Sequence, residues 1–203
     1  MKTKVCAADL EWTKEAIDVL GLAWDGGLMS TATGRDARTM DRFLDILRRA
    51  DRVVMQNGLD ADCRQLVKEG IDISWLQPKV FDTRLAAHTV SGHLAGTGSF
   101  DLRSLVLLFG SRQGQRFPLE WKQYESDLYR TCAFDAAASL WITPTLDRLI
   151  TAGHLQATVD IAHKCQPIFT LMKEQGVRLD RAVLEQIYAA RKQSVEQTIE
   201  KYH

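Results

Sequence analysis

One stretch near the N-terminus decides the predicted fold class: Lys4-Val-Cys-Ala-Ala-Asp-Leu-Glu-Trp12. Its small apolar run, which ends in charge, predicts a short buried strand over residues 4–10. Asp9 and Glu11 are two residues apart, so on a strand both carboxylates project from the same face. Like charges placed so close are costly unless a cation neutralises them. The alternative is that the strand simply ends here and both side chains are solvated, and the pair alone does not decide between the two.

Outward from this strand, the pattern predicts an α/β fold with a mixed five-stranded sheet flanked by helices. Further strands are predicted at 16–24, 28–32, 52–56 and 79–81, the first two joined by turn residues Asp25-Gly26-Gly27. Helices are predicted at 36–49, 60–70, 83–91, 101–109 and 126–142, with a kink or restart at Thr143 because Pro144 follows. Two more helices, 154–176 and 180–202, form a C-terminal helical appendage.

Composition, net charge and cysteine content exclude several classes of protein. The chain has 203 residues, of which 45% are apolar, and this excludes a disordered chain or a small disulfide scaffold. Lys and Arg total 26, as do Asp and Glu, so nucleic-acid binding must be local rather than a broad electrostatic attraction. Four isolated cysteines favour a reducing compartment. Without an apolar signal or membrane-length segment, we expect a soluble, cytoplasmic protein with no membrane partner.

Two further acidic positions are candidates for a site. Asn57-Gly-Leu-Asp-Ala-Asp62 follows a predicted strand, where polar residues are well placed to build one. Asp60 also suits a helix N-cap and Asp62 the first helical turn, so such a cluster, taken alone, is more often structural than catalytic. Asp135 lies in a predicted helix among small residues, which let the backbone approach a neighbouring element closely.

The order Asp-x-Glu, then Asn with a following Asp, then a helical Asp resembles the DnaQ-like (DEDD) 3′–5′ exonucleases. The closer resemblance is to the exonuclease domain of family A, phage-type DNA polymerases, with a ribonuclease H-like fold. Other stretches agree with it: Ile17–Asp25, Phe81-Asp-Thr-Arg-Leu-Ala-Ala-His88, Phe100–Leu105, Trp121-Lys122 and Pro167–Asp180, the last resembling the passage that leads into a polymerase domain.

The resemblance implies specific roles for individual residues. Asp9, Glu11, Asp62 and Asp135 would be catalytic metal ligands for two Mg²⁺ or Mn²⁺ ions, with Asp60 and Asp82 as additional candidates. Asn57 would help to place the scissile strand, and Leu10 would contact the terminal bases. Thr131 stands four residues before Asp135, where the family has a Tyr that orients the attacking water.

The function implied by the resemblance is proofreading hydrolysis of single-stranded DNA at its 3′ end. Residues 1–152 would form the exonuclease domain, and 153–203 would resemble the start of a polymerase domain, present in cis or as a separate chain. The setting would be the cytoplasm of a bacterium or of a phage-infected host. Two alternatives stay open: a weak or inactive exonuclease fold that serves as a structural or DNA-holding module, and a free-standing DnaQ-like nuclease that acts on RNA.

Overall fold

The computed structural model describes residues 4–14, 16–24, 27–32, 36–92, 100–112, 115–117, 127–176 and 180–202. The predicted turn at 25–26 and the Trp121-Lys122 pair lie outside these ranges. The chain divides into two compact units, Met1–Ile168 and Phe169–His203. The sheet and the candidate site belong to the first unit.

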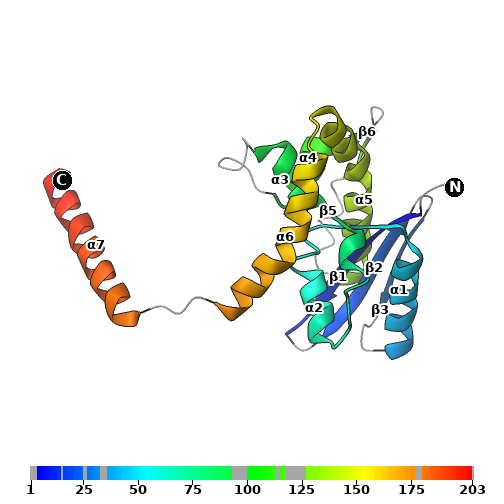
Figure 1. The fold of residues 1–203 in the computed structure, drawn as a ribbon, viewed down its shortest axis with the longest axis horizontal. Helices are drawn as coiled ribbons and strands as arrows, with labels where there is room; N and C mark the ends of the chain where they lie inside the picture. The colour runs from blue at the N-terminus through cyan, green and yellow to red at the C-terminus, as the bar shows by residue number, and fades with distance from the viewer. Residues whose placement is uncertain are drawn as a thin grey trace. The chain divides into compact units, whose positions relative to one another are not determined.

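The main sheet is mixed, with strand order β3-β2-β1-β4-β5 (Figure 1). The first three strands are an antiparallel meander, and β1, β4 and β5 run parallel. These elements confirm the predicted α/β class and the mixed sheet. The strand bounds are β1 Val5–Trp12, β2 Ile17–Trp24, β3 Gly27–Ala32, β4 Arg52–Met55 and β5 Val80–Asp82.

Helices account for most of the rest of the described chain. Their bounds are α1 Ala37–Arg49, α2 Asp62–Lys68, α3 Thr83–Val90, α4 Leu102–Phe109, α5 Leu128–Ala152, α6 Gln156–Gln175 and α7 Arg181–Tyr202. A short 3₁₀ helix, Gln77–Lys79, precedes β5. The prediction missed the small hairpin of β6 Ser111–Arg112 and β7 Gln115–Arg116, because two-residue strands are too short to show a period.

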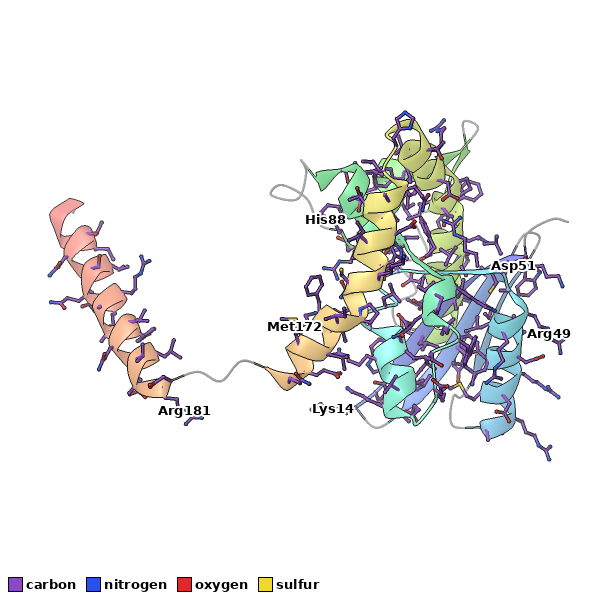
Figure 2. The ribbon with its side chains drawn as sticks, in the orientation of Figure 1. Lys14, Arg49, Asp51, His88, Met172 and Arg181 are labelled. Atoms are coloured by element: carbon purple, nitrogen blue, oxygen red, sulfur yellow. The ribbon has the colours of Figure 1, made fainter. Side chains whose placement is uncertain are left out.

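Alternation along β1 separates two hydrophobic cores on the two faces of the sheet. Ala8 and Leu10 pack with the apolar stripe of α1, which is the predicted one: Met40, Phe43, Leu44 and Leu47. Ala7 packs on the opposite side with buried residues of α3, α4 and α5. Figure 1 shows α1 beside the sheet, and Figure 2 shows Arg49 at the outer, solvent side of that helix. Asp9 and Glu11 alternate with Leu10, so they share the side of Ala7, toward α5.

Of the predicted kink or restart at Thr143, the restart is wrong, because α5 runs through Pro144 without interruption. The kink stays a prediction. A proline removes one backbone hydrogen bond from a helix. Here the surrounding residues Ile142, Leu146 and Ile150 are almost fully buried, so packing holds the helix together. The Thr143 hydroxyl also donates to the Ser139 carbonyl at 2.8 Å.

A glycine in β2 allows α5 to approach the sheet closely. A Cβ atom at Gly21 would lie 2.5 Å from the Cys132 carbonyl oxygen and 2.9 Å from its Sγ. Gly21 pairs with Asp9 across the β1–β2 ladder. The Cys132 thiol in turn donates to the Asp9 carbonyl at 3.3 Å. The close approach predicted from the small residues around Asp135 is therefore present, and it occurs beside Asp9.

In the second unit, α7 is a helix whose described side chains are exposed. They project around the helix from Arg181 onward (Figure 2). Several of them are large and apolar: Val183, Leu184, Ile187, Tyr188, Val195 and Ile199. Among the described residues, no helix is long and apolar enough to cross a membrane.

Replacing Gly21 by Ala should destabilise the protein by about 1–3 kcal/mol, the usual cost of overpacking a filled core. The new methyl group meets backbone atoms of α5, which cannot rotate away. Urea unfolding measures the change in free energy. Gly92→Ala is the matched control, because a Cβ there has no atom within 4 Å, and it should stay near wild type. Equal stability of the two variants would contradict the close approach.

Candidate active site

Three predicted carboxylates come together at one place. Asp9 and Glu11 project from β1 and Asp135 from α5, and an oxygen of each lies within 4.8 Å of the other two. All three side chains are half-buried. We call these three residues the acidic cluster. The cluster joins positions 126 residues apart, and this spacing of oxygen ligands is what a hard divalent cation requires.

The fourth predicted carboxylate, Asp62, lies next to the acidic cluster. It is the first residue of α2 and is only 3% exposed. Its Oδ1 accepts a hydrogen bond of 3.0 Å from the backbone N–H of Leu10, the residue between Asp9 and Glu11. That bond ties the start of α2 to the β1 segment that carries two of the cluster's ligands.

Buried like charge dominates the electrostatics of the site. Burial raises the pKa of Asp9 well above its usual range, and the neighbouring carboxylates Asp62, Asp135 and Glu11 raise it further. Burial also raises the pKa of Asp62 to about 8, against the opposing effect of backbone hydrogen bonds. Both shifts favour the protonated form of these carboxyl groups, and a bound cation would favour the charged form instead.

The structure distinguishes the two acids that follow β4. Asp60 was a candidate N-cap, but α2 begins after Ala61, and no side chain caps it. Asp60 lies in the preceding turn and is half-buried, whereas Asp62 is buried and bonded to Leu10. The bond to Leu10 therefore places Asp62 beside the acidic cluster.

Asp82 has a different place from the four carboxylates. It is the last residue of β5 and 1% exposed, and it caps α3 by accepting from the N–H groups of Arg84 and Leu85. Its carboxylate also accepts from the N–H groups of Asn57 and Leu59. Asn57 itself adopts a left-handed backbone conformation, with φ of 58°, which Asn tolerates better than most residues. Its role toward a nucleic-acid strand remains a prediction.

The predicted stacking contact of Leu10 is wrong. Its side chain is 3% exposed and packs in the core on the α1 side of the sheet, because alternation turns it away from Asp9 and Glu11. Leu10 contributes its backbone N–H instead. Thr131 is buried in α5, one helical turn before Asp135. Its role in orienting water remains a prediction.

The donor set fits divalent metal ions. Carboxylate oxygens are the ligands that Mg²⁺ and Mn²⁺ prefer, and the largest charge effects on Asp9 come from other carboxylates. Asp9, Glu11 and Asp135 are the residues that would hold an ion, with Asp62 beside them. The residues therefore support a divalent metal site.

Comparison with known proteins shows the fold. No protein-family model matches the sequence, and no curated protein is detectably similar to it. Among solved structures, NrnC from Brucella melitensis is similar with a TM-score of 0.59 and 14% sequence identity, over 86% of this chain and 87% of that chain. NrnC has the DEDD exonuclease, ribonuclease H-like fold. This chain shares that ribonuclease H-like fold. The comparisons do not support the expected link to family A polymerases.

The metal-free protein should lose stability as pH rises. The pKa of Asp62 is about 8 in the folded protein and ordinarily 3.8, so the folded state binds more protons between these values. The stabilisation from protonated Asp62 is complete below pH about 4 and is lost as pH rises through about 8. In EDTA, the melting temperature should therefore fall between pH about 6 and pH about 8.

Asp62→Asn should flatten this pH dependence, because the amide carries no charge and its oxygen can still accept from Leu10 N–H. Asp41→Asn, an exposed acid on α1, is the matched control and should keep the wild-type slope. Thermal melts of all three proteins at each pH provide the measurement. Parallel slopes for wild type and Asp62→Asn would show that Asp62 does not carry the raised pKa.

Proposed function

We propose that this chain is a metal-dependent 3′–5′ exonuclease that removes nucleotides from single-stranded ends. The observation that carries the proposal is the meeting of Asp9, Glu11 and Asp135 beside buried Asp62. A DnaQ-like fold supplies the context, since these positions are the ones that the DEDD resemblance assigns to metal ligands. We assign Mg²⁺ or Mn²⁺, as two ions, to these four carboxylates.

When bound, the metal ions would lower the pKa of the attacking water and stabilise the charge on the phosphate and on the leaving 3′ oxygen. The residues of the chain prepare the site for this chemistry. Asp9 and Glu11 hold their carboxylates on one face of a rigid strand, and Asp135 meets them from α5. The Leu10 N–H fixes the orientation of Asp62. Thr131, one turn before Asp135, would hold the attacking water through its hydroxyl, in place of a Tyr.

We favour a free-standing nuclease that acts on RNA over a DNA-proofreading domain. The likeness to NrnC extends over 86% of this chain and 87% of that chain. DNA was expected only because of the resemblance to polymerases, which the comparisons do not support. Single-stranded RNA is therefore placed first as the substrate, and single-stranded DNA second.

A 5′-labelled single-stranded RNA and a DNA of the same sequence test the proposal, each with Mg²⁺, Mn²⁺ or EDTA. We expect a metal-dependent ladder that shortens from the 3′ end, with RNA degraded faster. Asp9→Ala and Asp135→Asn should each reduce the rate by more than the roughly 10–100-fold that loss of an outer-shell residue costs. Asp41→Asn should leave the rate unchanged. Folded protein that yields no ladder with either metal would instead favour the inactive module.

A second candidate is an exonuclease domain that works beside a family A polymerase domain. The observation in its favour is the Pro167–Asp180 passage, together with the exposed apolar side chains of α7, which suit a helix that packs against a further partner. A preference for DNA over RNA in the same assay would support this candidate. Monomeric, non-aggregating protein in light scattering would speak against an uncovered apolar helix.

A further inference from the structure

We propose that Asp82 and His163 act together as a positioning pair that holds the turn carrying Asp62 at the acidic cluster. The inference rests on the proposed function for its catalytic meaning, but the contacts that carry it are independent of any activity. His163 belongs to α6 and Asp82 to the end of β5, 81 residues earlier. Neither residue is in the acidic cluster.

Asp82 organises the turn between β4 and α2. Its Oδ1 accepts from the N–H of Asn57 at 3.2 Å, and its Oδ2 accepts from the N–H of Leu59 at 3.2 Å. The carbonyl of Asn57 then accepts from the N–H groups of Asp60 and Ala61. Asp62 follows directly. A single carboxylate therefore sets the path of the backbone that delivers Asp62 to the N–H of Leu10.

The hydrogen bonds of Asp82 argue against a role as a metal ligand. Its oxygens accept from four backbone N–H groups, those of Asn57, Leu59, Arg84 and Leu85. Its carboxylate is therefore already engaged on both oxygens. Its charge still acts on the site, because it raises the pKa of Asp62. This arrangement is that of an outer-shell residue, which orients the groups that bind a metal.

His163 bonds to the backbone of Asp82, whereas the turn before α2 bonds to its carboxylate. Its Nε2 accepts a hydrogen bond of 2.8 Å from the backbone N–H of Asp82. Its Nδ1 lies 2.7 Å from the Val159 carbonyl oxygen, which can only accept. The ring therefore donates through Nδ1 and accepts through Nε2, which requires the neutral tautomer with its proton on Nδ1. The imidazole also stacks on Phe81, with ring centroids 5.7 Å apart.

His163 makes two kinds of contact with β5: its Nε2 accepts from the Asp82 N–H, and its ring stacks on Phe81. Two substitutions test these contacts separately. His163→Gln keeps an oxygen acceptor near the position of Nε2 and loses the ring. His163→Phe keeps a ring that can stack on Phe81 and loses the acceptor, leaving the Asp82 N–H without its partner. A cavity of about 640 Å³ borders His163 and Phe81, so both side chains have room. Lys164→Gln, an exposed neighbour on α6, is the matched control.

The first readout is amide hydrogen exchange measured by NMR on the metal-free full chain. We expect His163→Phe to lose protection at Asp82, at Asn57 and Leu59, and at Leu10. Leu10 is the decisive amide, because its partner is Asp62 and it has no bond to Asp82 or His163. His163→Gln and Lys164→Gln should keep wild-type protection at all four amides.

The second readout is Mn²⁺ affinity, measured by calorimetry, together with exonuclease kcat and KM. We expect His163→Phe to weaken Mn²⁺ binding by about 10-fold, the lower end of outer-shell effects, and to lower kcat more than it raises KM. His163→Gln should keep both the Mn²⁺ affinity and kcat close to those of the wild type. If wild-type protein neither binds Mn²⁺ nor degrades an oligonucleotide, the proposed function fails, and amide exchange still decides the inference.

Two outcomes would overturn the positioning pair. One is wild-type protection at Leu10 and Leu59 in folded His163→Phe. The other is equal behaviour of the Gln and Phe variants, which would make the acceptor irrelevant. If His163→Phe does not fold, Asp82→Asn tests the other half of the pair, since its amide offers only one acceptor oxygen. That variant should lose protection at Leu59 and Leu10, and retained protection there would equally contradict the inference.

Discussion

Repulsion between crowded, partly buried carboxylates is the constraint on which the rest of this structure depends. Asp9, Glu11 and Asp135 share a small volume beside Asp62, and burial adds to the cost of charging them. A fold can keep such a group together only if each side chain is held by a separate, well-packed element. Here β1, α2 and α5 supply those elements, and each is anchored by core residues on its other side.

The contacts around the acidic cluster show how that constraint is met. Gly21 brings α5 against β2 where a side chain would keep the two apart. The Cys132 thiol and the Leu10 N–H then donate to the Asp9 carbonyl and to Asp62. Asp82 and His163 extend this support to the turn before α2. Holding like charges close together lowers the free energy of unfolding, and binding of a cation would raise it again. The placement of these carboxylates is therefore better explained by metal binding than by a contribution to stability.

Local sequence pattern predicts part of this arrangement. The spacing of Asp9 and Glu11 places both on one face of a strand, and the apolar stripe of α1 follows from helical periodicity. The choice of Asp62 over Asp60 needed the resemblance to the exonuclease family, because either acid suits the beginning of a helix. The predicted contact of the Leu10 side chain with the terminal bases followed from its position between Asp9 and Glu11. Strand alternation instead turns this side chain into the core on the opposite face of the sheet.

Long-range contacts could not be predicted in the same way. The bond from Asp82 to His163 joins β5 to α6 across 81 residues, and no local pattern marks His163 as anything but a helical residue. The uninterrupted α5 likewise depends on tertiary packing, which outweighs the local penalty of Pro144. Both examples involve a contact whose partner lies on another element, and such partners become visible only once the fold has placed them.

The roles of individual motif residues also explain why the resemblance predicts the fold without supporting a link to a polymerase. In Phe81-Asp-Thr, Phe81 and Thr83 are buried and Asp82 caps α3 while holding the turn before α2. These contacts serve the fold and the placement of Asp62, so any protein with the same sheet and the same position of Asp62 has reason to keep them. The segment therefore indicates the fold and its acidic site, and it carries no information about an attached polymerase. The Pro167–Asp180 passage follows the last strand of the sheet, so the fold does not test its resemblance to the passage that leads into a polymerase domain. The preference for DNA or RNA in the nuclease assay tests that resemblance instead.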